Sequence, residues 1–97
     1  MMTKAAKQYF DLTGRSALIT GATRGIGFGL ASGLAKAGAK IILNGRNPEK
    51  LAEATDRLRL QDVFAQTLCF DVRDQAAVQK AINNYESADG PIDILIN

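Results

Sequence analysis

Histidine is absent from this chain of 97 residues, and cysteine occurs once, as Cys69. Without histidine, neither a Ser-His-Asp nor a Cys-His catalytic set can form within these residues. A lone cysteine excludes an internal disulfide framework, and it leaves too few nitrogen and sulfur ligands for a zinc site. Because Cys69 lies in the apolar run 67–70, we predict that its side chain fills the core.

Long hydrophobic runs and a strong excess of charge are also missing. No apolar stretch approaches the ~20 residues that span a bilayer, and residues 1–10 lack the apolar segment of a secretory signal. The formal net charge is only +2 and is spread along the chain, which argues against binding to nucleic acid or a membrane surface. We therefore expect a cytoplasmic protein whose partner is a small molecule.

The residues that are present have the balance of an ordinary globular domain, with 46% hydrophobic and 23% charged residues. We interpret residues 1–11 as an N-terminal extension and residues 12–97 as one domain. Short apolar runs, which predict strands, alternate in that domain with segments of helical periodicity. The predicted strands are 16–20, 40–44, 65–70 and 92–96.

Three helices are predicted between these strands. The first covers residues 25–37 and ends at Gly38. The second begins at Asn47-Pro48-Glu49, a capping residue followed by a helix-starting proline and an acid, and Asp74 caps the third. The residues predicted to face the core are Ile26, Leu30, Leu34 and Ala37 in the first helix, Leu51, Ala54 and Leu58 in the second, and Val78, Ala81, Ile82 and Tyr85 in the third.

Alternating strands and helices of this length predict an α/β fold with a doubly wound parallel sheet of the Rossmann type. The first three strands should lie in the order third-second-first, and the fourth should cross to the other side of the first. Ligands of such sheets bind where the strand order reverses, beyond the carboxyl ends of the strands. Because the fourth strand of such a sheet is normally internal, we expect these residues to be the N-terminal part of a longer domain.

A glycine-rich segment, Thr20-Gly21-Ala22-Thr23-Arg24-Gly25-Ile26-Gly27, joins the first strand to the first helix. Glycines permit a tight turn, and the first amides of a helix attract anions, so this turn can hold a phosphate. Its G-x-x-x-G-x-G spacing differs from the G-x-G-x-x-G dinucleotide fingerprint. Its place after the first strand of an alternating chain nevertheless favours nucleotide binding over a merely structural turn.

Thr-Gly-x-x-x-Gly-x-Gly resembles the cofactor motif of the short-chain dehydrogenase/reductase family. Asp71-Val72 resembles the family's adenine-contacting pair, Asp93-Ile94-Leu95-Ile96-Asn97 resembles the strand leading into its Asn-Asn-Ala-Gly motif, and Phe10-Asp11-Leu12-Thr13-Gly14-Arg15 resembles its usual lead-in. The resemblance implies hydride transfer to or from a carbonyl or secondary alcohol by a homo-oligomer. It also implies a catalytic Tyr, Lys, Ser and Asn beyond the fourth strand. Tyr9 and Tyr85 do not match that tyrosine, so we assign no catalytic residue.

The end of the second strand, Asn44-Gly45-Arg46, predicts which dinucleotide is bound. NAD-binding proteins usually place a carboxylate there against the ribose hydroxyls, and this chain has none. Arg46 and Arg24 can instead grip a 2′-phosphate, with Asn44 hydrogen-bonding nearby, which predicts NADP(H). Asn97 is expected near the cofactor ribose or in hydrogen bonds that order the sheet. The predicted cofactor-binding residues are Gly21, Thr23, Arg24, Gly25, Ile26, Gly27, Asn44, Arg46, Asp71, Val72 and Asn97.

The substrate is less constrained, because fold and cofactor site do not determine it. The stretch Leu43-Asn44-Gly45-Arg46-Asn47 resembles gluconate 5-dehydrogenase-like members of the family, which implies reduction of 5-ketogluconate. Enzymes similar to 3-oxoacyl-carrier-protein reductase or tropinone reductase remain alternatives within the family. A hypothesis of a different class is a non-catalytic nucleotide-binding fragment.

Overall fold

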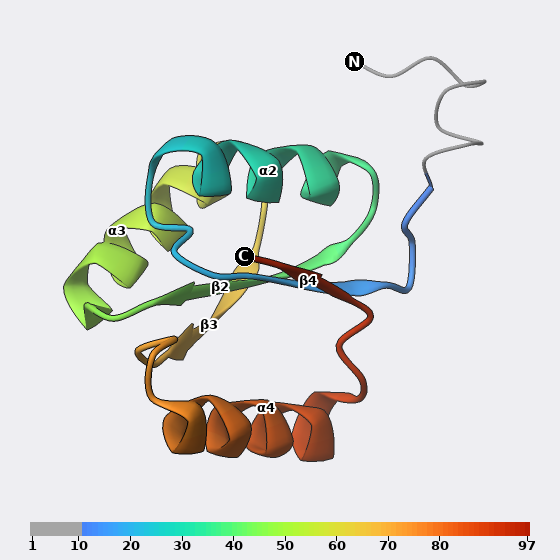
Figure 1. Ribbon diagram of the computed structural model, residues 1–97. Helices are drawn as coiled ribbons and strands as arrows, with labels where there is room; N and C mark the ends of the chain where they lie inside the picture. Colours follow the sequence, from blue (N-terminus) through green and yellow to red (C-terminus); the bar gives the residue numbers. More distant parts are fainter. Residues whose placement is uncertain (1–10) are drawn as a thin grey trace.

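The computed structural model describes residues 11–97, where four strands and three helices alternate along the chain (Figure 1). The strands β1 (Ser16–Ile19), β2 (Lys40–Gly45), β3 (Ala65–Cys69) and β4 (Ile94–Ile96) form one parallel sheet in the order β3-β2-β1-β4. This order confirms the predicted Rossmann-type topology, including the crossover of the fourth strand to the far side of the first. Residues 1–10 of the predicted extension, which include Tyr9, lie outside the described residues.

The register of the sheet places β1 at its centre. Leu18 pairs with Ile42 of β2 on one side and with Leu95 of β4 on the other. All four residues of β1 are buried, as expected for a strand with neighbours on both edges and helices on both faces. β4 begins two residues later than predicted, because the Ile92 amide donates to the side chain of Glu86 and does not join the strand ladder.

Two layers of helices enclose the sheet (Figure 1). The helices α2 (Gly25–Lys36) and α3 (Pro48–Arg59) cover one face, and α4 (Gln75–Asp89) covers the other. Because successive side chains of a strand point to opposite faces, Ile41 and Leu43 pack in the cluster on the α2 and α3 side. Ile42 packs with Tyr85 on the α4 side.

The predicted buried faces of α3 and α4 are confirmed. Leu51, Ala54 and Leu58 are buried in α3, and Tyr85 is buried in α4, where the three other residues predicted to face the core are partly buried and pack beside it. Those three are Val78, Ala81 and Ile82. Both predicted caps are present, because the side chain of Asn47 accepts from the amides of residues 49 and 50, and that of Asp74 accepts from the Ala77 amide.

The predicted apolar stripe of α2 is wrong in its first half. Ile26 is 84% exposed and Leu30 is 42% exposed, whereas Phe28, Ala31 and Ser32 are buried. The helix is set by the approach of Gly27 to the glycine turn, and successive residues are about 100° apart around a helix, so Ile26 turns away from the sheet. The second half agrees with the prediction, because Leu34 packs against the core and Ala37 is buried.

The prediction that the Cys69 side chain fills the core is also wrong, because this side chain is exposed. It ends β3, which lies at the edge of the sheet formed by residues 11–97. Its thiol sulfur lies 3.4 Å from the backbone oxygen of Arg46, and its neighbour Phe70 takes the buried position. Across the described part of the chain, no helix has both the length and the apolar character needed to cross a membrane.

Candidate nucleotide-binding site

The glycine turn leaves β1 at the carboxyl edge of the sheet and is tied to β2. Gly21 and Gly25 both have positive φ, at 60° and 67°, a conformation that glycine adopts without steric cost. The Gly21 amide donates to the side-chain oxygen of Asn44 at 3.3 Å, and the Ala22 amide donates to the backbone oxygen of Asn44 at 3.1 Å. The turn is therefore held in place by one residue of the neighbouring strand.

The start of α2 differs from the starts of the other two helices. Its N-cap residue, Arg24, makes no side-chain cap hydrogen bond. The helices α3 and α4 are capped by Asn47 and Asp74. Because the first amides of a helix need acceptors from outside it, the glycine turn opens onto a helix end suited to an anion.

Gly27 lets α2 approach this turn closely. A Cβ atom at this position would lie 3.0 Å from the Ala22 Cα and 3.1 Å from the Gly21 oxygen. Both are backbone atoms of the turn, so they cannot move aside without changing it. A side chain at this position would therefore strain the contact between the helix and the turn.

Replacing Gly27 by alanine should lower the free energy of unfolding by about 1–3 kcal/mol, as expected for overpacking a tight contact. The matched control is Gly29→Ala in the same helix, where a Cβ atom would meet nothing within 4 Å. That variant should gain up to about 1 kcal/mol, because alanine favours helix more than glycine does. Urea unfolding of the two variants measures the contrast. Equal stabilisation by both would contradict the close approach at Gly27.

A cleft of about 510 Å³ lies beside the turn, over the carboxyl ends of β2 and β3. It is lined by Gly21, Thr23, Arg24, Asn44, Gly45, Arg46, Asn47, Lys50, Phe70, Asp71, Val72 and Arg73. Seven of the predicted cofactor-binding residues are in that lining, and Gly25, Ile26, Gly27 and Asn97 are outside it. Four cations and one carboxylate face this cleft, so its electrostatic character suits an anionic ligand.

Five lining residues were not predicted, namely Gly45, Asn47, Lys50, Phe70 and Arg73. Signals for three of them are present in the sequence. Gly45 immediately precedes Arg46, and a Cβ atom there would lie 2.9 Å from the Thr23 methyl group. Lys50 is in the first turn of α3, which begins at the cleft, and Arg73 shares a loop with Asp71.

Asn44 lines the cleft, but its side chain makes its hydrogen bonds with the protein backbone. The residue is 2% exposed, and its amide nitrogen donates to the backbone oxygens of Leu68 and Phe70 at 3.1 and 3.0 Å. Its side-chain oxygen accepts from the Gly21 amide. Asn44 therefore joins β2, β3 and the glycine turn, so its role at the site is to position them.

Asn97 lies at the end of β4, beside the start of the turn. Its side-chain oxygen accepts from the hydroxyl of Thr20 at 3.2 Å, and the same hydroxyl is 3.2 Å from the backbone oxygen of Ile96. Of the two roles predicted for Asn97, these contacts support the ordering of the sheet. Its contact with a cofactor stays a prediction.

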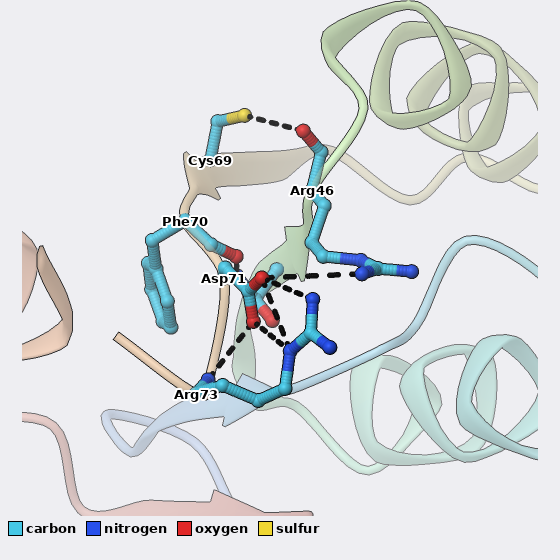
Figure 2. A network of polar contacts seen from close by, with 6 residues as sticks. Arg46, Cys69, Phe70, Asp71 and Arg73 are labelled. Atoms are coloured by element: carbon cyan, nitrogen blue, oxygen red, sulfur yellow. Dashed lines mark hydrogen bonds and ion pairs between the residues drawn. The ribbon is translucent and has the colours of Figure 1, made fainter. Parts of the chain in front are cut away.

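Asp71 sits between two arginines at the far side of the cleft, and Figure 2 shows both guanidinium groups directed at its carboxylate. Arg73 donates to it from its backbone and its side chain, with the shortest distance, 2.8 Å, from Nη2 to Oδ2. Arg46 Nη1 lies 3.9 Å from the same Oδ2. The pKa of Asp71 is lowered to about 2, mainly by the side-chain hydrogen bond from Arg73. The Asp71 carboxylate is therefore negatively charged at neutral pH.

Comparison with known proteins places this geometry in a family. Residues 15–97 match the family model described as short chain dehydrogenase. Gluconate 5-dehydrogenase of Gluconobacter oxydans is 51% identical over 91% of this chain and 34% of its own length. The chain thus spans about a third of the length of that curated relative.

Two solved structures share the fold of the described residues. A gluconate 5-dehydrogenase from Burkholderia cenocepacia, in complex with NADP and tartrate, is 50% identical with a TM-score of 0.83, covering 93% of this chain and 35% of its own. A 3-oxoacyl (acyl-carrier-protein) reductase from Agrobacterium tumefaciens, with NADP bound, is 37% identical with a TM-score of 0.82, covering 98% of this chain and 37% of its own. Together with the match of the family model over most of the sequence, these likenesses establish that the chain belongs to the short-chain dehydrogenase family.

Proposed function

We propose that this chain forms the NADP(H)-binding part of an oxidoreductase that interconverts a carbonyl compound and a secondary alcohol. The observation that carries the proposal is the cationic cleft, which is lined by Arg24 of the glycine turn and by Arg46 after β2, where the strand ends without a carboxylate. A carboxylate at that position would repel a 2′-phosphate, whereas an arginine can bind it with two parallel hydrogen bonds. The two structural relatives described above, both solved with NADP bound, support the same choice.

The residues present fit the dinucleotide from its phosphates to its adenine. The amides at the start of α2 would receive the pyrophosphate, and Gly27 would keep the helix close to the turn. Arg24 and Arg46 would bind the 2′-phosphate, and Asp71 and Val72 would contact the adenine. When bound, the nicotinamide supplies or accepts the hydride. The part assigned to this chain is to bind and orient the cofactor.

For the substrate we propose 5-ketogluconate, with gluconate as the product of its reduction. The support is the identity of 51% and 50% to two proteins named gluconate 5-dehydrogenase, against 37% to the reductase of acyl-carrier-protein substrates. The loop after β2 belongs to the segment that carries this likeness. Reduction of 5-ketogluconate by the full-length protein, with a 3-oxoacyl thioester as the competing substrate, tests the assignment.

Cofactor selection tests the main proposal directly. NADPH should bind this chain at least about tenfold more tightly than NADH, which corresponds to about 1.4 kcal/mol of binding free energy. The measurement is titration calorimetry with each nucleotide, and the full-length protein should show the same preference in kcat/KM. Equal affinity for the two nucleotides would remove the basis of the NADP(H) assignment.

A further inference from the structure

The carboxylate of Asp71 lies beside the cation to which the proposed function gives the 2′-phosphate. Its Oδ2 atom is 3.9 Å from Arg46 Nη1, and both residues line the cleft. A phosphate held by Arg46 would therefore lie close to a second negative charge. Like charges at such short separations repel each other strongly unless another group compensates one of them. The proposed phosphate site thus contains a group that opposes its ligand.

Arg73 is placed to compensate that charge. Asp71 Oδ1 accepts from the Arg73 backbone amide at 2.9 Å and from Nε at 3.1 Å, while Oδ2 accepts from Nη2 at 2.8 Å. Both carboxylate oxygens are engaged by one planar guanidinium, the arrangement in which an arginine pairs with a carboxylate most strongly. Figure 2 shows that Arg73 approaches the carboxylate from a different side than Arg46 does. Compensation by Arg73 therefore does not require Arg46.

We propose that Arg73 is a specificity-determining residue, which neutralises Asp71 and thereby allows Arg46 to hold a 2′-phosphate beside that carboxylate. The inference rests on the proposed NADP(H) function and adds a residue to it. An adenine contact by Asp71 would be made with any adenine nucleotide, so it would not distinguish ligands with and without the phosphate. In this proposal Asp71 contacts the adenine of any adenine nucleotide, and Arg73 allows a 2′-phosphate to bind beside Asp71.

Two ligands that differ by one group give the appropriate test, namely adenosine 2′,5′-bisphosphate and adenosine 5′-monophosphate. Arg73→Gln should reduce the preference for the bisphosphate about tenfold, because an uncompensated carboxylate then faces the phosphate. Adding Asp71→Asn should restore the preference to within about threefold of the original protein, because the repelling charge is gone. A lost adenine contact would weaken both ligands alike and cancel in the ratio. Arg73→Lys, which keeps the charge, should retain most of the preference.

The matched control is Arg59→Gln, which removes an exposed arginine outside the cleft lining and should leave the ratio unchanged. Three results would overturn the inference. Arg73→Gln could weaken both ligands by the same factor, which indicates a structural role. The double variant could keep the reduced ratio, which indicates that Arg73 touches the phosphate itself. The unaltered protein could bind both ligands equally, which would overturn the NADP(H) proposal as well.

Discussion

Replacing Arg46 by aspartate should weaken the binding of NADPH about 100-fold or more and leave NADH binding within about threefold of its original value. The substitution removes the planar cation at the end of β2 and puts a carboxylate in the same cleft, beside Asp71. The 2′-phosphate carries nearly two negative charges at neutral pH, whereas the ribose hydroxyl of NADH carries none. The charge reversal should therefore weaken the binding of NADPH far more than that of NADH.

Titration calorimetry with both nucleotides measures this effect, and Arg59→Asp is its control. Arg59 is an exposed residue of the last turn of α3, outside the cleft lining, so the same charge reversal there should leave the preference intact. The preference of the Arg46 variant should also depend less on salt, because salt screens exposed charges. Retained NADPH selectivity in Arg46→Asp would show that the 2′-phosphate binds elsewhere.

Replacing Asn44 by aspartate should lower the free energy of unfolding by about 3 kcal/mol or more, although the two side chains have nearly the same shape. The Asn44 amide nitrogen donates to the backbone oxygens of Leu68 and Phe70, and an aspartate cannot replace both hydrogen bonds, because its carboxylate only accepts and its protonated form has a single O–H to donate. Since the residue is 2% exposed, water cannot replace the lost hydrogen bonds. The glycine turn should lose order together with the sheet edge, so nucleotide affinity should fall as well.

The stability of this variant is measured by urea unfolding, with Asn84→Asp as the control. Asn84 is exposed in the middle of α4, so the same chemical change there should alter the free energy of unfolding by about 0.5 kcal/mol or less. A small effect at both positions would contradict the assignment of Asn44 as the residue that joins β2, β3 and the turn.

The errors in the sequence prediction have physical causes. In α2 the buried face combines one large apolar residue, Phe28, with the small residues Ala31 and Ser32, which carry little hydrophobic signal. Ile26 and Leu30 dominate the periodicity of that helix although they are exposed. In α3 and α4 the large apolar residues do face the core, so the same reasoning succeeded there. Hydrophobic periodicity therefore identifies the buried face of a helix only when the large apolar residues are the ones that are buried.

The sequence by itself determined the alternation of strands and helices, the order of the sheet, and the glycine turn followed by Arg46 at the end of the second strand. These are local patterns, and the handedness of parallel connections translates them into topology. Only the tertiary structure decided which distant residues meet. The register that pairs Gly45 with Cys69 brings Arg46 beside Asp71, with Arg73 on the same loop, and it buries the Asn44 side chain against β3. Such contacts depend on the alignment of two strands far apart in the chain, which composition and spacing do not specify.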